Sequence, residues 1–364
     1  MTPTSILTVN AGSTSTKLAI IDDTDDVTWS RTIPPDPTAL HAALEDARHV
    51  PIAVTAVGHR IVHGGTRFVE PVLVDDEILT AIGDLSELAP IHNQAGLAGI
   101  TATRAAFPDL PHVACFDTAF HTTIPPAAHT YGGPRHWLDQ GYRRYGFHGL
   151  SHQHAATRTA ELLQRPSADL ALVSCHLGGG CSITAIAGGH SIDTTMGFTP
   201  LDGLVMATRS GSIDPALILH LLRHGVGLDE LDDTLEHHSG LLGLSGVSSD
   251  VRKVITARDH GHPDARLAID VFVHRLASGI GAMTAALDHL DAIIFTGGIG
   301  ENNPEIRARA VARLTWLGAT ISPAANAQPH LDADIATHDA PTRILVIKNR
   351  EDLIIAHASR TTVS

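Results

Sequence analysis

Two stretches of the chain share one pattern: an apolar, β-branched run, a turn of glycine and small polar residues, and a second apolar run. The first is ILTVNAGSTSTKLAIID near the start, and the second is LALVSCHLGGGCSITAIAGG near mid-chain. Aligning Val9 with Cys175 sets residues 12–15 against residues 178–181. Each stretch predicts a strand–turn–strand hairpin. Because the repeat distance is far longer than the roughly 20–50 residues of a solenoid repeat, we predict two similar domains facing a cleft.

Elsewhere the pattern alternates between strands and helices. Strands are predicted in AVTAVGHRIVH, HVACFDTA, DAIIFTGG and RILVIK, and helices near residues 38–47, 77–85, 93–106 and 265–289. Asp214-Pro215 predicts a helix start with a stop at Gly225, and Asn303-Pro304 predicts a helix that runs to Gly318. The chain ends as strand, turn and helix, whereas the Pro- and Asp-rich residues 322–341 favour a loop. This alternation predicts an α/β fold.

Composition narrows the class of protein. With 43% apolar and 18% charged residues, the 364-residue chain is that of a globular protein. The formal charge of −14 argues against a nucleic-acid partner. The apolar runs are shorter than the roughly 20 residues of a membrane span, and no secretory leader is visible, so we expect a cytoplasmic protein. The three cysteines lack a Cys-x-x-Cys pair and are expected to be reduced and buried.

Two glycine-rich segments carry candidate ligand chemistry. The turn NAGSTSTK offers backbone N–H groups, hydroxyls, an amide and the Lys17 ammonium, which are phosphate-binding groups, although it is not a Walker A loop. The same residues also suit an ordinary β-turn. FTGGIGENN follows a strand and precedes a helix, which favours a nucleotide site or, alternatively, a tight structural turn. It lacks the dinucleotide fingerprint G-x-G-x-x-G.

Several charged residues lie at the ends of the predicted elements. Arg60 and Arg209 stand beside glycine-rich turns, where a guanidinium can hold an anionic substrate with two hydrogen bonds. Asp117 and Glu351 follow strands and suit Mg²⁺, though each alone also fits a helix cap or an exposed carboxylate. The cluster YGFHGLSHQH has no His-Glu-x-x-His spacing and no cysteine, so a histidine acting on a phosphoryl group is favoured over a zinc site.

Taken in order, these motifs resemble the acetate kinase (acetate/propionate kinase) family, within the superfamily of sugar kinases, heat-shock ATPases and actin. The resemblance covers nearly the whole chain and rests on NAGSTSTK, GHRIVHGG, APIHN, FDTAFH, YGFHGLSH, HLGGG, GFTPLDG, RSGSIDP, SSDVRK, FTGGIGEN and RED. It implies two duplicated ribonuclease-H-like domains with the actin-like ATPase fold and a nucleotide cleft between them. The expected first domain is 1–147 with the C-terminal helix 352–364, and the second, carrying the nucleotide pocket, is 148–351.

The resemblance also assigns roles to particular residues. It implies a reversible transfer of the ATP γ-phosphoryl group to acetate or propionate, with acyl phosphate and ADP as products, Mg²⁺ (or Mn²⁺) as cofactor and a homodimer as the assembly. The implied catalytic residues are Arg60, Asp117, His148 and Arg209; the phosphoryl-binding residues are Asn10, Ser13, Ser15 and Lys17; the metal-binding residues are Asn10 and Glu351. The implied carboxylate pocket consists of Arg60, Val62, Ile91, His92, Phe147 and Pro200. The implied nucleotide-binding residues are Lys17, His176, Gly178, Gly179, Gly180, Asp250, Val251, Arg252, Gly298, Ile299, Gly300 and Asn302.

The chain departs from the family pattern at a few positions. Gly179 and Ser212 replace the usual asparagine and aspartate, Arg350 replaces the asparagine before Glu351, and Gln94 and Gly96 replace Pro and Asn near the acyl pocket. The segment from Lys17 to Gly58 is also shorter than usual. Two alternatives therefore stay open: a carboxylate kinase with altered acyl or donor specificity, and a non-catalytic ATP-binding sensor of the same fold.

Overall fold

The computed structural model describes residues 5–12, 15–85, 90–327 and 329–364, the side chains of residues 90–92 excepted. The chain divides into two compact units. The first comprises residues 1–122, 147–154 and 350–364, and the second comprises residues 123–146 and 155–349. Residues 123–146 thus group with the second unit, although they were expected in the first domain. Residues 148–154, 350 and 351 group with the first unit, although they were expected in the second domain.

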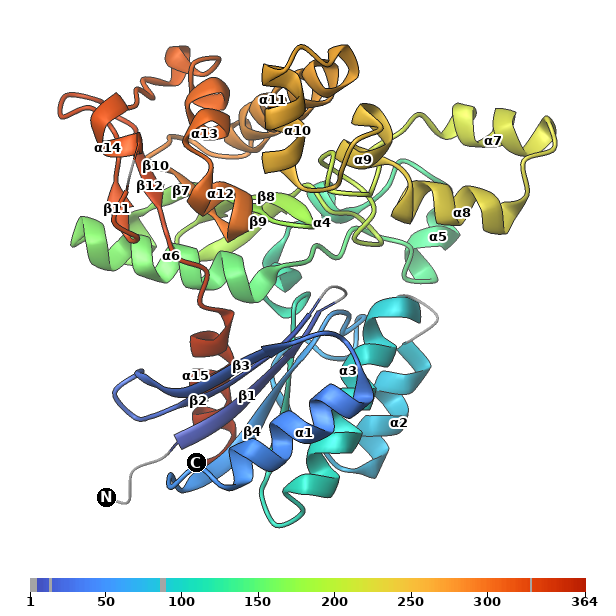
Figure 1. The fold of residues 1–364 in the computed structure, drawn as a ribbon, viewed down its shortest axis with the longest axis vertical. Helices are drawn as coiled ribbons and strands as arrows, with labels where there is room; N and C mark the ends of the chain where they lie inside the picture. The colour runs from blue at the N-terminus through green and yellow to red at the C-terminus, as the bar shows by residue number, and fades with distance from the viewer. Residues whose placement is uncertain (1–4, 13–14, 86–89, 328) are drawn as a thin grey trace. The chain divides into compact units, whose positions relative to one another are not determined.

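The first unit is built on a six-stranded sheet in the order β3-β2-β1-β4-β6-β5 (Figure 1). β1 pairs antiparallel with β2, and β2 with β3, while β1, β4 and β6 run parallel; β5 is an antiparallel edge strand. The strands are β1 (Ser5–Ala11), β2 (Thr16–Ile21), β3 (Val27–Ile33), β4 (Val54–Ile61), β5 (Val72–Leu73) and β6 (His112–Phe116).

The second unit repeats this topology. Its sheet has the order β11-β12-β10-β7-β8-β9, with β7 antiparallel to β8, β8 to β9, and β7, β10 and β12 parallel. Val9 pairs with Leu18 as Cys175 pairs with Ile183, so the alignment of Val9 with Cys175 gives equivalent hairpins. The aligned turns differ by one residue, because Ala11 pairs with Thr16 whereas Leu177 pairs with Cys181, which already belongs to β8. The predicted duplication is therefore confirmed. The strands are β7 (Ala171–Leu177), β8 (Cys181–Ala187), β9 (His190–Thr194), β10 (Ala292–Thr296), β11 (Ala333–Asp334) and β12 (Arg343–Val346).

Helices cover both faces of the first sheet because its central strands are buried on both, whereas the edge strand β3 is largely exposed. Leu7, Val9 and Leu18 face a cluster that includes Leu40 and Leu44 of α1. Ile6, Ala19, Ile21 and Ala56 face Ala356 of the C-terminal helix α15. The helices and 3₁₀ turns are α1 (Pro37–Arg48), α2 (Asp76–Asp84), α3 (Pro90–Ala106), η2 (Ala119–Thr123) and α15 (Glu351–Val363); α6 (Gly149–Leu163) begins in this unit and continues into the second.

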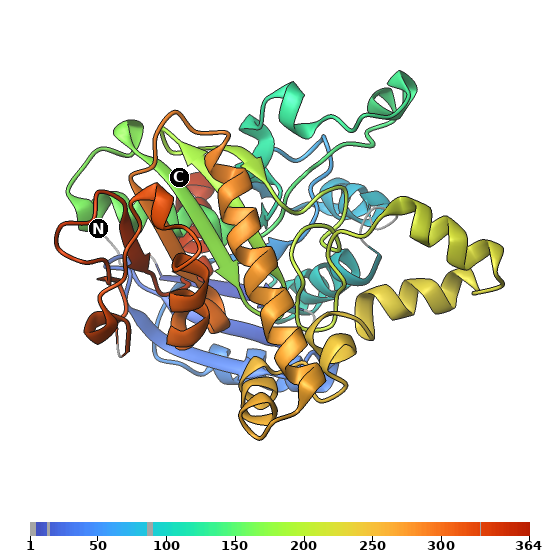
Figure 2. The ribbon, with the colours of Figure 1, turned by 90° about the horizontal axis from the view of Figure 1, so that it is seen from above.

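In the second unit, the long helix α11 (Pro263–Thr284) packs against β7 and β8 (Figure 2). Its inward stripe includes Ile269, Phe272, Leu276 and Ile280, all buried. Among the described residues it is also the one helix long and apolar enough to cross a membrane, a property that a buried core helix shares. The other elements are α4 (Pro126–His129), α5 (Arg135–Asp139), η3 (Ser167–Asp169), α7 (Pro215–Arg223), α8 (Leu228–His237), α9 (Gly240–Ser245), α10 (Val251–Asp259), α12 (Gly297–Asn302), α13 (Pro304–Val311), η4 (Thr315–Leu317) and α14 (Pro323–Ala327).

Two sequence expectations need correction, and two hold. The helix after Asn303-Pro304 begins as predicted, with the Asn303 side chain as cap, but it ends at Val311; only a 3₁₀ turn precedes Gly318, whose φ is 71°. Residues 322–341 are not all loop, since they hold α14 and β11. Asp214 caps α7 as predicted. All three cysteines are buried and free, as expected.

Candidate active site

The polar residues of the first unit meet at one edge of its sheet. Asn10 lies at the end of β1, Arg60 at the end of β4, and Asp117 directly follows β6. These three strands are parallel, so their carboxyl ends share an edge. Residues an even number apart on a strand share a face of the sheet. Ile6, Ala56 and Cys115 stand an even number of residues before Asn10, Arg60 and Asp117, respectively, and all three lie in clusters with α15. The three polar side chains therefore share one face of the sheet.

A continuous hydrogen-bond network joins these side chains to Glu351. Arg60 holds Asp117 with two bonds, from Nε to Oδ1 (2.9 Å) and from Nη2 to Oδ2 (2.5 Å). Its Nη1 donates to Asn10 Oδ1 (3.2 Å), and Asn10 Nδ2 donates to Glu351 Oε2 (2.6 Å). Four residues that the sequence analysis selected from distant parts of the chain are thus in direct contact.

Burial and charge fix the protonation states of this network. Burial opposes the charged form of Arg60, but the carboxylates of Asp117 and Glu351 outweigh it and raise the arginine's pKa above its ordinary value. Burial raises the pKa of the Asp117 carboxyl, and the facing Arg60 opposes that rise. Arg60 is therefore a permanent cation at the sheet edge, 12% exposed, with its Nε and Nη2 fixed by Asp117.

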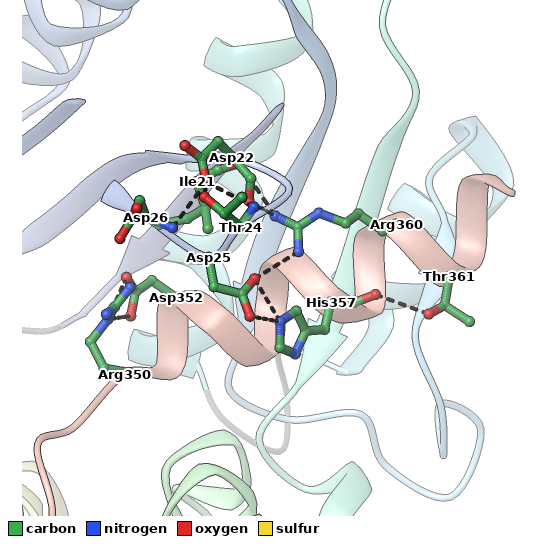
Figure 3. Close-up of polar contacts among 10 residues, drawn as sticks. All are labelled: Ile21, Asp22, Thr24, Asp25, Asp26, Arg350, Asp352, His357, Arg360 and Thr361. Carbon is green, nitrogen blue, oxygen red and sulfur yellow. Dashed lines mark hydrogen bonds and ion pairs between the residues drawn. The ribbon is translucent and has the colours of Figure 1, made fainter. Parts of the chain in front are cut away.

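Glu351 owes its position to the anchoring of α15, of which it is the first residue. At the far end of the helix, Arg360 donates to Asp25 Oδ1 (2.9 Å) and to the Asp22 carbonyl, and His357 contacts the same Asp25 carboxylate at 2.7 Å (Figure 3). These bonds tie the helix to the β2–β3 turn. At its start, Arg350 Nε bonds both oxygens of Asp352 (3.0 Å each). The cation that replaces the usual asparagine is therefore directed toward Asp352.

His148 is held in an unusual backbone conformation beside Asp117. Its φ of 56° lies in the left-handed region, which residues other than glycine seldom adopt. The His148 backbone hydrogen-bonds the Asp117 side chain, and the Gly149 N–H donates to the Asp117 carbonyl (3.1 Å). A Cβ on Gly149 would lie 2.0 Å from that carbonyl oxygen, so the position requires glycine. Strain of this kind is typical of functional sites.

The remaining predicted residues of the first unit fall around this edge or outside the described part. Lys17 pairs with Asn10 across the hairpin and is exposed, and the Ser15 carbonyl closes the turn by accepting from Gly12 (3.0 Å). Val62 and Phe147 are buried. Ser13 and the side chains of Ile91 and His92 lie outside the described residues.

In the second unit, Arg209 is held by a residue that the sequence did not reveal. Its Nε donates to Glu236 Oε2 (2.7 Å), and both side chains are largely buried, at 14% and 15% exposed. Glu236 belongs to α8, and its carbonyl also accepts from Thr208 Oγ1 (2.8 Å). No motif contains Glu236, and only an expectation that a buried arginine needs a carboxylate partner points to one.

The predicted nucleotide residues of the second unit lie on glycine turns and helix starts. Gly178 N–H donates to the Gly180 carbonyl (2.9 Å) in the turn between β7 and β8, and Gly179 is exposed. The motif GGIGEN is itself the short helix α12, where Asn302 Nδ2 donates to the Gly298 carbonyl (2.9 Å). His176 of the predicted set is buried, and Asp250 caps α10, which begins with Val251 and Arg252. Ile299 and Gly300 lie in α12. Pro200, which was predicted for the carboxylate pocket, is a buried loop residue.

The donor set of the first unit fits a hard divalent cation. No group of three or more His, Cys, Asp or Glu side chains forms a metal cluster in the part of the chain that the structure describes, which leaves no zinc-type site there. Glu351 and Asn10 instead supply one carboxylate and one amide oxygen, and they are joined by the hydrogen bond from Asn10 Nδ2 to Glu351 Oε2 (2.6 Å). Mg²⁺ is typically bound by one or two carboxylates plus substrate phosphates and water, so this small set is adequate.

The repeated sheets and the polar strand ends define a two-unit α/β protein of the kind that holds anionic ligands at the carboxyl ends of its strands. The model of the acetokinase family matches residues 38–357, and the chain belongs to that family. An acetate kinase of Synechococcus sp. is 54% identical over 305 residues, covering 84% of this chain and 76% of the relative. The acetate kinase of Gloeobacter violaceus is 51% identical over 308 residues, with the same shares.

Solved structures give the same result for the fold. The crystal structure of Porphyromonas gingivalis acetate kinase matches with a TM-score of 0.90 and 29% identity, covering 99% of this chain and 100% of that one. A propionate kinase from Francisella tularensis matches with a TM-score of 0.90 and 36% identity, covering 98% and 99%. The predicted duplicated, actin-like ATPase-type architecture is confirmed.

Proposed function

We propose that this protein is an acetate kinase, which reversibly transfers the γ-phosphoryl group of ATP to the carboxylate of acetate or propionate. A carboxylate oxygen forms a bond to the γ-phosphorus, the bond from that phosphorus to the bridging oxygen breaks, and ADP leaves. The observation that carries the proposal is the Glu351–Asn10–Arg60–Asp117 network in a member of the acetokinase family.

The chemistry needs a cation more than a base. A carboxylic acid with a pKa of about 4 to 5 is already ionised at neutral pH, so its oxygen attacks without losing a proton. The obstacle is repulsion between two anions, the carboxylate and the γ-phosphate. Arg60 meets this need, because its pKa is raised and it stays charged, and Asp117 fixes the plane of its guanidinium. Arginines that act on phosphoryl transfer contribute about 10³ to 10⁵ in rate.

We assign His148 to stabilising the transferring phosphoryl group, with Asp117 as the residue that positions both neighbours. Asp117 bonds the Arg60 guanidinium through its side chain and contacts the backbone of His148. One rigid carboxylate therefore orients two donors toward one region, a preorganised arrangement that costs no rearrangement during the reaction. Asn10, Ser13, Ser15 and Lys17 would complete the phosphoryl-binding turn.

Glu351 and Asn10 would hold Mg²⁺ (or Mn²⁺). When bound, the ion neutralises charge on the nucleotide phosphates. The two residues are already joined by a hydrogen bond, and the anchored helix α15 fixes the carboxylate. Loss of the Glu351 carboxylate should therefore weaken metal binding, while the two hydrogen bonds from Arg60 to Asp117 stay in place.

The second unit would supply the nucleotide pocket and the second arginine. Residues 176–180, 250–252 and 298–302 would bind ATP, and Arg209, oriented by Glu236, would reach the transferring group. Val62, Ile91, His92, Phe147 and Pro200 would form the pocket for a short acyl chain. Direct in-line transfer requires closing the site against water. We further propose a cytoplasmic homodimer.

The test is acyl hydroxamate formation by purified protein with ATP, Mg²⁺ and hydroxylamine, comparing acetate, propionate, butyrate and no carboxylate. Signal strongest with acetate or propionate is the expected result. Signal only with longer acids would favour a kinase of altered acyl specificity. If no acid gives signal in folded protein, the same panel with diphosphate as donor separates an altered donor from a non-catalytic ATP sensor.

A further inference from the structure

The Glu301 side chain joins two segments that are far apart in the sequence. Its Oε1 accepts from the N–H of Gly297, the first residue of α12 (3.0 Å), and from the N–H of Asn349, which follows β12 (2.9 Å). Bonds that end on a carboxylate oxygen are stronger than bonds between neutral groups. Glu301 has no role in the set implied from sequence, although Gly300 and Asn302 on either side are implied in nucleotide binding.

Arg307 fixes the backbone that carries this carboxylate. Its side chain is fully buried, and its Nη1 donates to the α12 carbonyls of Gly300 (2.7 Å) and Glu301 (2.9 Å). Its Nε and Nη2 donate to the Asn326 side chain (2.8 Å) and carbonyl (2.9 Å). Burial lowers the pKa of Arg307 to about 10, so the guanidinium stays charged at neutral pH and complements the negative end of the helix. Glu301 therefore has little freedom to leave its two partners.

Asn349 is the last residue of the second unit, and the proposed metal ligand Glu351 follows two positions later in the first unit. Residues 347–349, here called the linker, connect β12 to the point where the chain enters the first unit. The bond from the Asn349 N–H to Glu301 fixes the end of the linker to α12. A ligand that steadies α12 therefore also steadies the linker.

The linker has a second anchor that does not involve α12. The Lys348 N–H donates to Asp332 Oδ1 (3.0 Å), and Asp332 Oδ2 accepts from Arg158 Nε (2.7 Å) on α6. Two neighbouring linker amides thus end on two different carboxylates. Loss of either carboxylate loosens the linker, but the Glu301 carboxylate is the one that belongs to the proposed nucleotide helix. Asp332 is therefore the matched control.

We infer that Glu301 is a positioning residue that couples the nucleotide helix to the linker, so that ATP bound at α12 steadies the chain leading to Glu351. In this role Glu301 acts through the backbone of Gly297 and Asn349. The inference rests on the proposed function, because it places ATP at α12. Such coupling is reciprocal, so a fixed linker raises ATP affinity as much as ATP steadies the linker.

Hydrogen–deuterium exchange of the linker amides, with and without ATP, tests the coupling. Mg²⁺ is left out, so that protection cannot arise from a metal held by Glu351, and equilibrium dialysis sets a saturating ATP concentration for each protein. In the wild type we expect ATP to slow linker exchange by about fivefold or more. Glu301→Ala should lose this effect, whereas Glu301→Gln should keep most of it, because its amide oxygen still accepts both bonds. Asp332→Ala should exchange faster without ATP and still keep the ATP effect.

Three exchange results would overturn the coupling. The first is a linker that ATP leaves unprotected in the saturated wild type. The second is full protection in saturated Glu301→Ala. The third is an equal loss of the ATP effect in Asp332→Ala, which would mean that any loosening of the linker abolishes protection.

Kinetics give the second readout. Glu301→Ala should raise the KM for ATP and the Mg²⁺ concentration for half-maximal activity by about fivefold or more, with kcat at saturation within about threefold of the wild type. Glu301→Gln should restore both constants. A fall in kcat with an unchanged KM for ATP would contradict the coupling.

The same experiments separate this coupling from the proposed function. If ATP protects the linker through Glu301 but no acyl phosphate forms, the proposed function fails and the coupling stands. If acyl phosphate forms while ATP leaves the linker unprotected, only the coupling fails. A wild type that binds no ATP would overturn both.

Discussion

At the scale of single residues, the Arg60 side chain makes hydrogen bonds to two site residues that its own motif, GHRIVHGG, does not contain. Its guanidinium donates hydrogen bonds from Nε and Nη2 to Asp117 and from Nη1 to Asn10. Lysine can replace the charge but not this fork, because an ammonium is a point charge without planar geometry. Replacing Arg60 by lysine therefore tests the orientation of the cation while keeping its charge.

We expect Arg60→Lys to lower kcat by about 10³, since arginine contributions of this order are typical of phosphoryl transfer. The KM for ATP should change little, because the proposed nucleotide residues lie mainly in the other unit. The control is Arg104→Lys, an arginine paired with Asp76 at 2.9 Å on the surface. Steady-state kinetics on both variants decide the matter: comparable losses in the two, or a loss confined to the ATP KM, would contradict the role given to Arg60.

Gly179 offers a gain-of-function test at the same scale. The position is usually asparagine in the family, and a Cβ placed here meets nothing within 4 Å. Gly179→Asn should therefore fold normally and lower the KM for ATP by about tenfold, because one hydrogen bond to a charged group is worth about 1.5 kcal/mol. Gly132→Asn, at another open glycine, is the matched control. An unchanged KM in both would show that this turn does not contact the nucleotide phosphates.

At the scale of elements, the position of Glu351 depends on how closely α15 approaches β4. A Cβ on Gly58 would lie 2.4 Å from Ser359 Oγ and 2.5 Å from Ile355 Cγ2. The strand must therefore have glycine here for the helix to pack flat on the sheet. Glu351 shares a helix face with Ile355 and Ser359, because the three are spaced four residues apart, so the close contact at Gly58 also sets the position of Glu351.

We expect Gly58→Ala to cost about 1–3 kcal/mol in the free energy of unfolding, the usual penalty for an overpacked core. It should also raise the Mg²⁺ concentration needed for half-maximal activity, because displacing α15 displaces Glu351. Gly99→Ala on α3, where the nearest atom is 3.8 Å away, should be neutral or stabilising. Denaturant titration and metal titration measure the two effects, and an unaltered metal requirement in a destabilised Gly58→Ala would refute the link.

Local sequence patterns predicted the strands and helices well, but they predicted poorly which residues meet in the tertiary fold. The hairpins, the Asx-Pro helix starts and the C-terminal strand–turn–helix follow from turn chemistry and capping, which are local. The helix after Pro304 was predicted too long, because it breaks after Val311. Asn10, Arg60, Asp117 and Glu351 of the candidate network were all predicted from sequence. Glu236 was not predicted, because only the tertiary fold brings it to Arg209.

At the scale of the whole molecule, buried histidines link stability to pH. His59 and His112 contact each other through His59 Nε2 and His112 Nδ1 (3.0 Å), and burial lowers the pKa of both, His59 most strongly. Burial lowers the pKa of His121 to about 4, although its bond to the Phe147 carbonyl opposes the shift. All three lie in the first unit, beside the strands that carry the site.

A histidine with a depressed pKa in the folded state stabilises the protein above pH 6.5, and this contribution is lost as the pH falls toward the folded-state pKa, because the unfolded chain takes up protons first. For His121 alone, lowering the pH from 7 to 5 should remove about 2 kcal/mol of unfolding free energy. The raised pKa of Asp117 acts in the opposite sense. We therefore expect the urea concentration at the midpoint of unfolding to fall steeply between pH 7 and pH 5. The variant His121→Gln should flatten this pH dependence. The control His41→Gln, at an exposed position of α1, should leave it unchanged. The first unit contains His59, His112 and His121, whereas in the second unit burial lowers the pKa of His129. Because more of these histidines lie in the first unit, acid should open that unit first. ATP affinity should then outlast acyl phosphate formation as the pH falls, whereas simultaneous loss of both would mean that the two units unfold as one.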